Sequence, residues 1–141
     1  KDSSIIEWVA FASNAFNVLV PFYADVNEIP EYLGNTTGEV STDNFYWSSR
    51  LIAAMADASY RKSIFHIERY QEHVMSRAHE LIGLCDASLA KESDADKRLE
   101  LKQKANQALA DMLKAETAST LDKVLYELSN LMKNAYSRSD A

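Results

Sequence analysis

The sequence predicts a mainly helical α+β chain, in which a short N-terminal β segment precedes long amphipathic helices packed as antiparallel hairpins. Residues 5–26 are rich in aromatic and β-branched residues and carry no charge between Glu7 and Asp25. From residue 42 onward there is no proline and one glycine, Gly83. Apolar residues recur there at spacings of three and four, the period of a helix with one buried face. Such faces bury one another most simply in antiparallel helix pairs.

The composition restricts the classes of function. A chain of 141 residues that is 47% hydrophobic can bury a core without disulfides or metal. The 21 acidic and 15 basic residues give a formal net charge of −6, which argues against a nucleic acid partner. No apolar run approaches the roughly 18 residues of a membrane helix, and no signal-peptide pattern is visible. The sequence therefore predicts a cytoplasmic protein with no membrane partner.

The β segment is expected to contain two strands, at about 5–12 and 16–23. The turn-forming residues Ser13-Asn14-Ala15 separate them. Pro21 cannot donate a ladder hydrogen bond, so the second strand is expected at an edge, a bulge or a strand end. The alternative is one buried helix over residues 4–19.

Residues 24–42 form a long connection with one possible helical turn at Pro30 to Leu33. Because a connection of this length in a compact domain tends to cover something, we expect it to lie over an apolar surface. The domain organisation that follows is a β-hairpin-like segment with this loop over 1–42 and a helical region over 43–141, together one structural unit.

Four helices are expected in the helical region, at about 43–60, 63–91, 94–116 and 119–136. Hydroxyl-bearing residues that can cap or restart them are Ser41, Thr42, Ser63 and Ser93. The joint between the last two is predicted at Thr117 to Thr120. Since neither glycine nor proline enforces that joint, a single helix over 94–136 is the alternative.

No catalytic or metal site is predicted from the residues themselves. None of the three histidines, His66, His73 and His79, has a glutamate three residues before it, as a two-metal carboxylate bundle requires, and no His-Glu-x-x-His motif occurs. Cys85, the one cysteine, lies in an apolar helical stripe with no neighbouring base, so we interpret it as a small core residue. We therefore expect no metal and no cofactor.

Three segments carry a resemblance to a known family: VAFASNAFNVLVPFYADV, EYLGNTTGEVSTDNFYWSSRLIAAMADASY and IERYQEHVMSRAHELI. They resemble the C-terminal region of the PepD-type bacterial dipeptidases, members of the N-terminal-nucleophile hydrolase superfamily related to penicillin V acylase and bile salt hydrolase. The resemblance covers roughly residues 5–90 and is most specific over Val20 to Tyr60. It implies that the two strands derive from the edge of the superfamily's sheet and that the chain is a fragment of a larger enzyme.

The resemblance also implies an activity for that larger enzyme. In such enzymes an N-terminal cysteine attacks the dipeptide and its free α-amino group acts as the base. Lys1 stands at the first position here, so this chain alone is predicted not to hydrolyse peptides and to supply scaffold. The alternative is a non-catalytic helical module for protein interaction or oligomerisation.

Four residues are candidates for contact with the dipeptide substrate. Asn14 and Asn17, in a polar turn, could donate hydrogen bonds to it, and Phe22 and Tyr23 could form a pocket wall. The alternative for the same residues is a plain turn and core aromatics. The apolar strip from Ile5 to Tyr23 would expose unpaired strand edges, so we expect either a homo-oligomer or burial of this strip under the chain's own helices.

Overall fold

The computed structural model describes residues 4–10 and 15–140, with side chains described up to residue 132. In chain order the elements are the strands β1 (Ile6–Val9) and β2 (Val20–Tyr23), followed by the helices α1 (Glu31–Gly34), α2 (Phe45–Ala58), α3 (Tyr60–Leu89) and α4 (Ala95–Asp140). This confirms the mainly helical fold with two short antiparallel strands at its N-terminal end.

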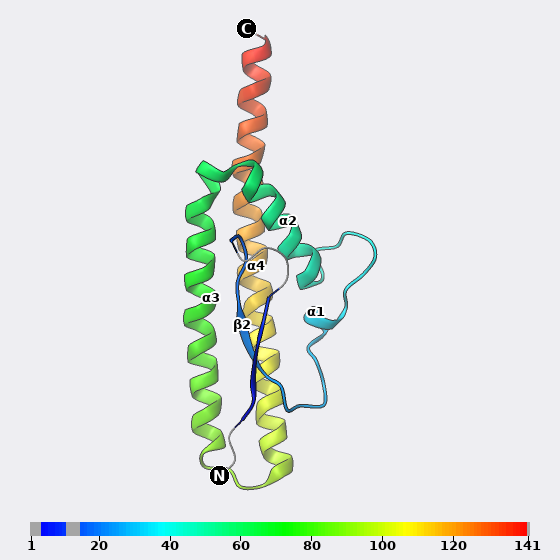
Figure 1. The fold of residues 1–141 in the computed structure, drawn as a ribbon, viewed down its shortest axis with the longest axis vertical. Helices are drawn as coiled ribbons and strands as arrows, with labels where there is room; N and C mark the ends of the chain where they lie inside the picture. Colours follow the sequence, from blue (N-terminus) through cyan, green and yellow to red (C-terminus); the bar gives the residue numbers. More distant parts are fainter. Residues whose placement is uncertain (1–3, 11–14, 141) are drawn as a thin grey trace.

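The long helices form the frame of the molecule. α3 and α4 run side by side as an antiparallel hairpin, and α2 packs on α4 from another side (Figure 1). The C-terminal part of α4 extends past the corner between α2 and α3 (Figure 1). The expected helices 43–60 and 63–91 correspond to α2 and α3, whose ends differ from the prediction by two or three residues.

The two strands form one antiparallel ladder that lies against the helical hairpin. Ile6 pairs with Tyr23 and Val9 with Val20. All four residues of β2 are buried, and this strand packs on α3 and α4, whereas β1 is the outer strand. The alternative of a buried helix over 4–19 is therefore wrong.

The strands are shorter than the predicted ranges 5–12 and 16–23, and positions 13 and 14 of the predicted turn Ser13-Asn14-Ala15 lie outside the described residues. Before β2, the backbone carbonyl of Asn17 accepts a hydrogen bond from the Gln71 amide of α3 at 2.9 Å. This hydrogen bond ties the segment before β2 to α3.

The start of α2 shows why the predicted caps were wrong. Asn44 is the N-cap, and its side chain accepts the Trp47 N–H at 2.9 Å. The Ser41 hydroxyl instead accepts the Asp43 N–H at 3.1 Å, closing a local turn outside the helix. Ser41 and Thr42 therefore precede the helix without capping it.

The other two predicted hydroxyl residues do not begin helices either. Ser63 is buried inside α3, one turn after its start, and its hydroxyl lies 2.7 Å from that of Ser59. Before α4, the carboxylate of Asp94, and not Ser93, accepts the Lys97 N–H at 3.0 Å. The cap thus lies one residue later than predicted.

The predicted joint at Thr117 to Thr120 is also wrong, because α4 is continuous through it and the single-helix alternative holds. Both hydroxyls have hydrogen-bond partners, one on α3 and one within α4. Thr117 hydrogen-bonds the Tyr70 hydroxyl of α3 at 2.8 Å, and Thr120 donates to the Glu116 carbonyl at 2.9 Å. Because both hydroxyl groups already have partners, neither threonine interrupts the helix.

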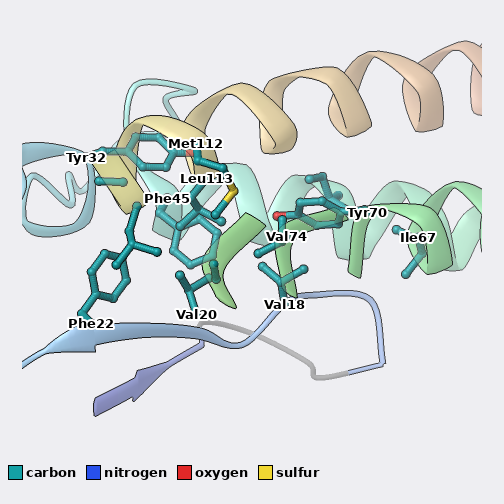
Figure 2. Packing of buried hydrophobic residues seen from close by; sticks show 14 of the residues in the cluster. Val18, Val20, Phe22, Tyr32, Phe45, Ile67, Tyr70, Val74, Met112 and Leu113 are labelled. Carbon is teal, nitrogen blue, oxygen red and sulfur yellow. The ribbon is translucent and has the colours of Figure 1, made fainter. Parts of the chain in front are cut away.

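One main hydrophobic core joins all the helices to β2. Its side chains come from β2, from the short helix α1 and from every long helix, and Figure 2 shows Val20 and Phe22 pointing from the strand towards the helices. The connection covers this core through Tyr32, which is buried with its ring centroid 5.9 Å from that of Phe45. The expected helical turn is present there as α1, and the connection does lie over an apolar surface.

Candidate functional site

A pocket of about 410 Å³ opens beside the strand hairpin, between its face and the connection that follows β2. It is lined by Glu7 and Val9 of β1, Phe22 and Tyr23 of β2, Ala24 and residues 26–30 of the connection, Leu33 of α1 and Asn106 of α4. Glu7 and Phe22 are directly opposite each other in the ladder, so both side chains lie on the same face of the sheet. The pocket therefore continues the face through which β2 meets the core.

Asn106 fixes the strand wall of this pocket to α4. Its side-chain oxygen accepts the Tyr23 N–H at 2.8 Å, and its side-chain nitrogen donates to the Tyr23 carbonyl at 2.9 Å. Asn106 is 2% exposed and Tyr23 is 1% exposed. The amide thus takes the place of a neighbouring strand, satisfying two backbone groups on the side of β2 that faces away from β1.

The Tyr23 side chain is held on the opposite side of the strand from Phe22. Its hydroxyl donates to the Asp86 carboxylate of α3 at 2.6 Å. Burial, and then the hydrogen bond to Asp86, raise the pKa of Tyr23 well above its usual value. The phenol is a neutral hydrogen-bond donor and anchors β2 to α3.

Cys85 lies in the same small cluster as Tyr23. Its thiol points to the Leu101 carbonyl, with sulfur and oxygen 3.5 Å apart. Burial raises the pKa of the Cys85 thiol, which keeps it protonated. The structure thus places this cysteine as the sequence predicts, in a core position that disfavours the thiolate.

A partly buried ion pair holds the end of β2 against α4. The Lys102 ammonium donates to the Asp25 carboxylate at 2.5 Å, and the two side chains are 7% and 35% exposed. Lys102 and Asn106 are four residues apart, so they lie on the same face of α4. Together they fix the backbone at the point where the strand becomes the wall of the pocket.

The rim of the pocket is acidic. Glu7 and Glu28 line it from the strand and from the connection, both exposed to solvent. A neighbouring hollow shares Glu28 and adds Glu31 of α1. No basic residue is among the described residues that line either space.

The structure does not bring the candidate substrate residues together in one pocket. Phe22 and Tyr23 form part of the pocket wall, although most of the Phe22 side chain is core and the Tyr23 hydroxyl faces α3. Asn17 is buried and lines a separate pocket of about 200 Å³ against Gln71 of α3. Asn14 lies outside the described residues.

The sequence reasoning missed Asn106, Glu7 and Glu28. A signal for Asn106 was present, because it precedes Leu109 by three residues and Leu113 by seven, which places an amide in the apolar stripe of the helix. Glu7 and Glu28 gave no such signal, since isolated glutamates are ordinary surface residues.

His66 and His73 lie along the α3–α4 interface and His79 is exposed on α3; none of the three is among the residues that line this pocket. The His66 ring nitrogen is 2.8 Å from a Glu127 carboxylate oxygen, and that of His73 is 3.5 Å from Glu116. In the part of the chain that the structure describes, no three His, Cys, Asp or Glu residues are grouped so that they could hold a metal ion. Nor is any described helix long and apolar enough to cross a membrane.

The amino-acid sequence matches a family of peptidases. The profile of Peptidase family C69 matches residues 1–73, just over half of the chain, and the chain belongs to this family. This confirms the resemblance to the dipeptidases that the sequence predicts.

Several proteins similar to this chain carry dipeptidase names. A Probable dipeptidase A of Streptococcus pyogenes serotype M18 is 39% identical over 140 residues, which cover 99% of this chain and 29% of the relative. A Dipeptidase of Bifidobacterium longum is 35% identical over 175 residues, covering 98% of this chain and 33% of the relative. Dipeptidase A of Lactobacillus helveticus is 26% identical over 135 residues, covering 96% and 28%. The chain thus spans a third or less of the length of these relatives.

Proposed function

We propose that residues 1–141 are part of a longer polypeptide that hydrolyses dipeptides, in which they supply a helical scaffold and one wall of a substrate pocket. The observation that carries this proposal is the 39% identity to a probable dipeptidase over nearly the whole chain, together with the 29% coverage of that relative. The similarity extends over helices beyond residue 73, so the relatives share the scaffold as well as the family region.

The nucleophile of this reaction comes from outside these residues. A cysteine-type mechanism needs a thiolate next to a base. Cys85 is the one cysteine of the chain, and it is a buried, protonated thiol near the C-terminal end of α3. The family resemblance instead assigns the attack to an N-terminal cysteine whose own α-amino group is the base.

The scaffold role is supported by the way the helices hold β2. Three polar contacts tie the end of this strand to the helical hairpin: the Asn106 amide, the Tyr23 hydroxyl and the Asp25–Lys102 pair. A strand fixed in this way presents Phe22 and Glu7 at the pocket in one defined position. Precise positioning of a substrate contributes to catalysis because small displacements lower the rate.

The experiment compares the longer polypeptide with residues 1–141 alone on a panel of dipeptides, and free amino acids are measured. We expect turnover by the longer polypeptide, loss of turnover after alkylation of accessible thiols, and none by residues 1–141. A Cys85→Ala variant of the longer polypeptide is the control and should keep its turnover. Absence of turnover on every dipeptide, or hydrolysis by residues 1–141, would refute the proposal.

A second candidate, an association module, is favoured by one specific observation. Several large apolar side chains of α4 are exposed near the end of the described side chains: Leu125, Tyr126, Leu131 and Met132. Exposed apolar groups gathered on one helix are typical of a helix-packing surface. Sedimentation of the wild type and of a Leu125→Glu, Met132→Glu variant tests this, since an assembly through this surface dissociates in the variant. Homo-oligomerisation and a cytoplasmic location stay predictions from the sequence.

A further inference from the structure

We infer that the pocket beside the strand hairpin binds the free ammonium group of a peptide together with its first, apolar side chain. This inference rests on the proposed dipeptidase function and specifies which part of the substrate the pocket takes. It is carried by the combination of an apolar hollow and two carboxylates that have no ion-pair partner among the described residues.

The wall and the floor of the pocket are suited to an apolar side chain. Val9, Phe22, Val26 and Leu33 contribute hydrocarbon surface from four different segments of the chain. The volume of about 410 Å³ lies within the range of pockets that bind small molecules. An aliphatic or aromatic side chain of one amino acid can be buried there.

The charged groups that line the pocket are negative. Glu7 lines it from β1 and Glu28 from the connection after β2. The Asn106 amide already uses both its oxygen and its nitrogen on Tyr23. A ligand therefore meets carboxylate acceptors at the rim, and an ammonium group, with three donors and no acceptor, is the complementary partner.

The residues around the pocket also favour a cationic ligand. The basic residue packed behind the pocket, Lys102, is buried and held by Asp25. Glu31 lines the neighbouring hollow, which shares Glu28 with this pocket. The chain as a whole carries a net charge of −6. An anionic ligand would be repelled here, whereas a cationic one is attracted.

The experiment measures binding of two probes by calorimetry, using the longer polypeptide that contains residues 1–141. L-phenylalaninamide carries the ammonium group, and N-acetyl-L-phenylalaninamide has the same side chain without the charge. We expect the first probe to bind about fivefold more tightly or better, because exposed ion pairs each contribute a modest free energy. Raising the ionic strength should weaken the first probe only.

Isosteric variants locate the binding site. Glu7→Gln with Glu28→Gln removes both charges at exposed positions and should abolish the difference between the probes. Glu100→Gln, an exposed residue of α4 that does not line the pocket, is the matched control and should keep the difference.

The outcomes separate this inference from the proposed function. Equal affinity for the two probes, no binding of either, or a difference that survives in the double variant overturns the inference, even where dipeptides are hydrolysed. Binding that depends on Glu7 and Glu28 supports it, even where no dipeptide is turned over and the proposed function fails.

Discussion

Replacement of Asn106 by alanine should destabilise the protein more than any exposed substitution on α4. The change removes two hydrogen bonds, at 2.8 and 2.9 Å, and leaves the Tyr23 N–H and carbonyl without partners at a site where Tyr23 is 1% exposed. Each buried backbone group left without a partner costs about 1–3 kcal/mol. We therefore expect the free energy of unfolding to fall by about 2–5 kcal/mol, measured by urea denaturation followed by helical circular dichroism.

An aspartate at position 106 tests the two hydrogen bonds one at a time. In Asn106→Asp a carboxylate can still accept the Tyr23 N–H but cannot donate to the carbonyl, whereas the protonated acid can do both. Burial raises the pKa of such a carboxyl in the folded state, so its contribution is present at low pH and is lost as the pH rises above about 4. The difference in the free energy of unfolding between wild type and Asn106→Asp should therefore increase as the pH rises above about 4.

The neighbouring Gln107→Ala variant is the control for Asn106, because Gln107 is exposed and bonds only the Asp111 side chain of its own helix. It should change the free energy of unfolding by less than about 0.5 kcal/mol. If Asn106→Ala is as mild as this control, then the amide does not hold the strand and our account of the pocket wall is wrong.

Three further predictions concern polar contacts that join the strand to the helices or one helix to another. Burial raises the pKa of Tyr23 and Tyr70, so their stabilising contribution is complete below the ordinary phenol value of about 10 and is lost as the pH rises beyond it. The free energy of unfolding should fall above that pH, and a variant with both tyrosines replaced by phenylalanine should show a shallower fall; an equal slope contradicts this. Asp25→Asn should cost about 1–3 kcal/mol because it leaves the Lys102 charge buried without its partner, and Lys102→Met should cost less because it removes that charge; urea denaturation giving the reverse order would show that an unpaired Lys102 is not the source of the cost. Thr117→Val should cost about 1–2 kcal/mol through the lost bond to Tyr70 without reducing helical circular dichroism; a loss of helix signal would show that α4 depends on this hydroxyl.

Part of the pocket wall could be named from the sequence. Phe22 and Tyr23 were proposed as a pocket wall for a substrate, and both line the pocket beside the strand hairpin; their contact with a substrate stays a prediction. Asn17 could not be placed in the same way, because its position depends on the Gln71 side chain 54 residues later. Glu7 and Glu28 become neighbours of one hollow only when the connection folds back beside the strand.

The sequence by itself determined the helical class, the two strands and the family. Apolar periodicity is a local property, and it specifies a buried face wherever the helix packs. Only the tertiary structure decided that α4 passes unbroken through Thr117 to Thr120, where local preferences are nearly balanced between a joint and a helix and the Tyr70 hydroxyl of another helix settles the balance. The pocket was decided in the same way, since Asn106 and Lys102 bond a strand about 80 residues earlier, a distance in sequence at which no local pattern carries information.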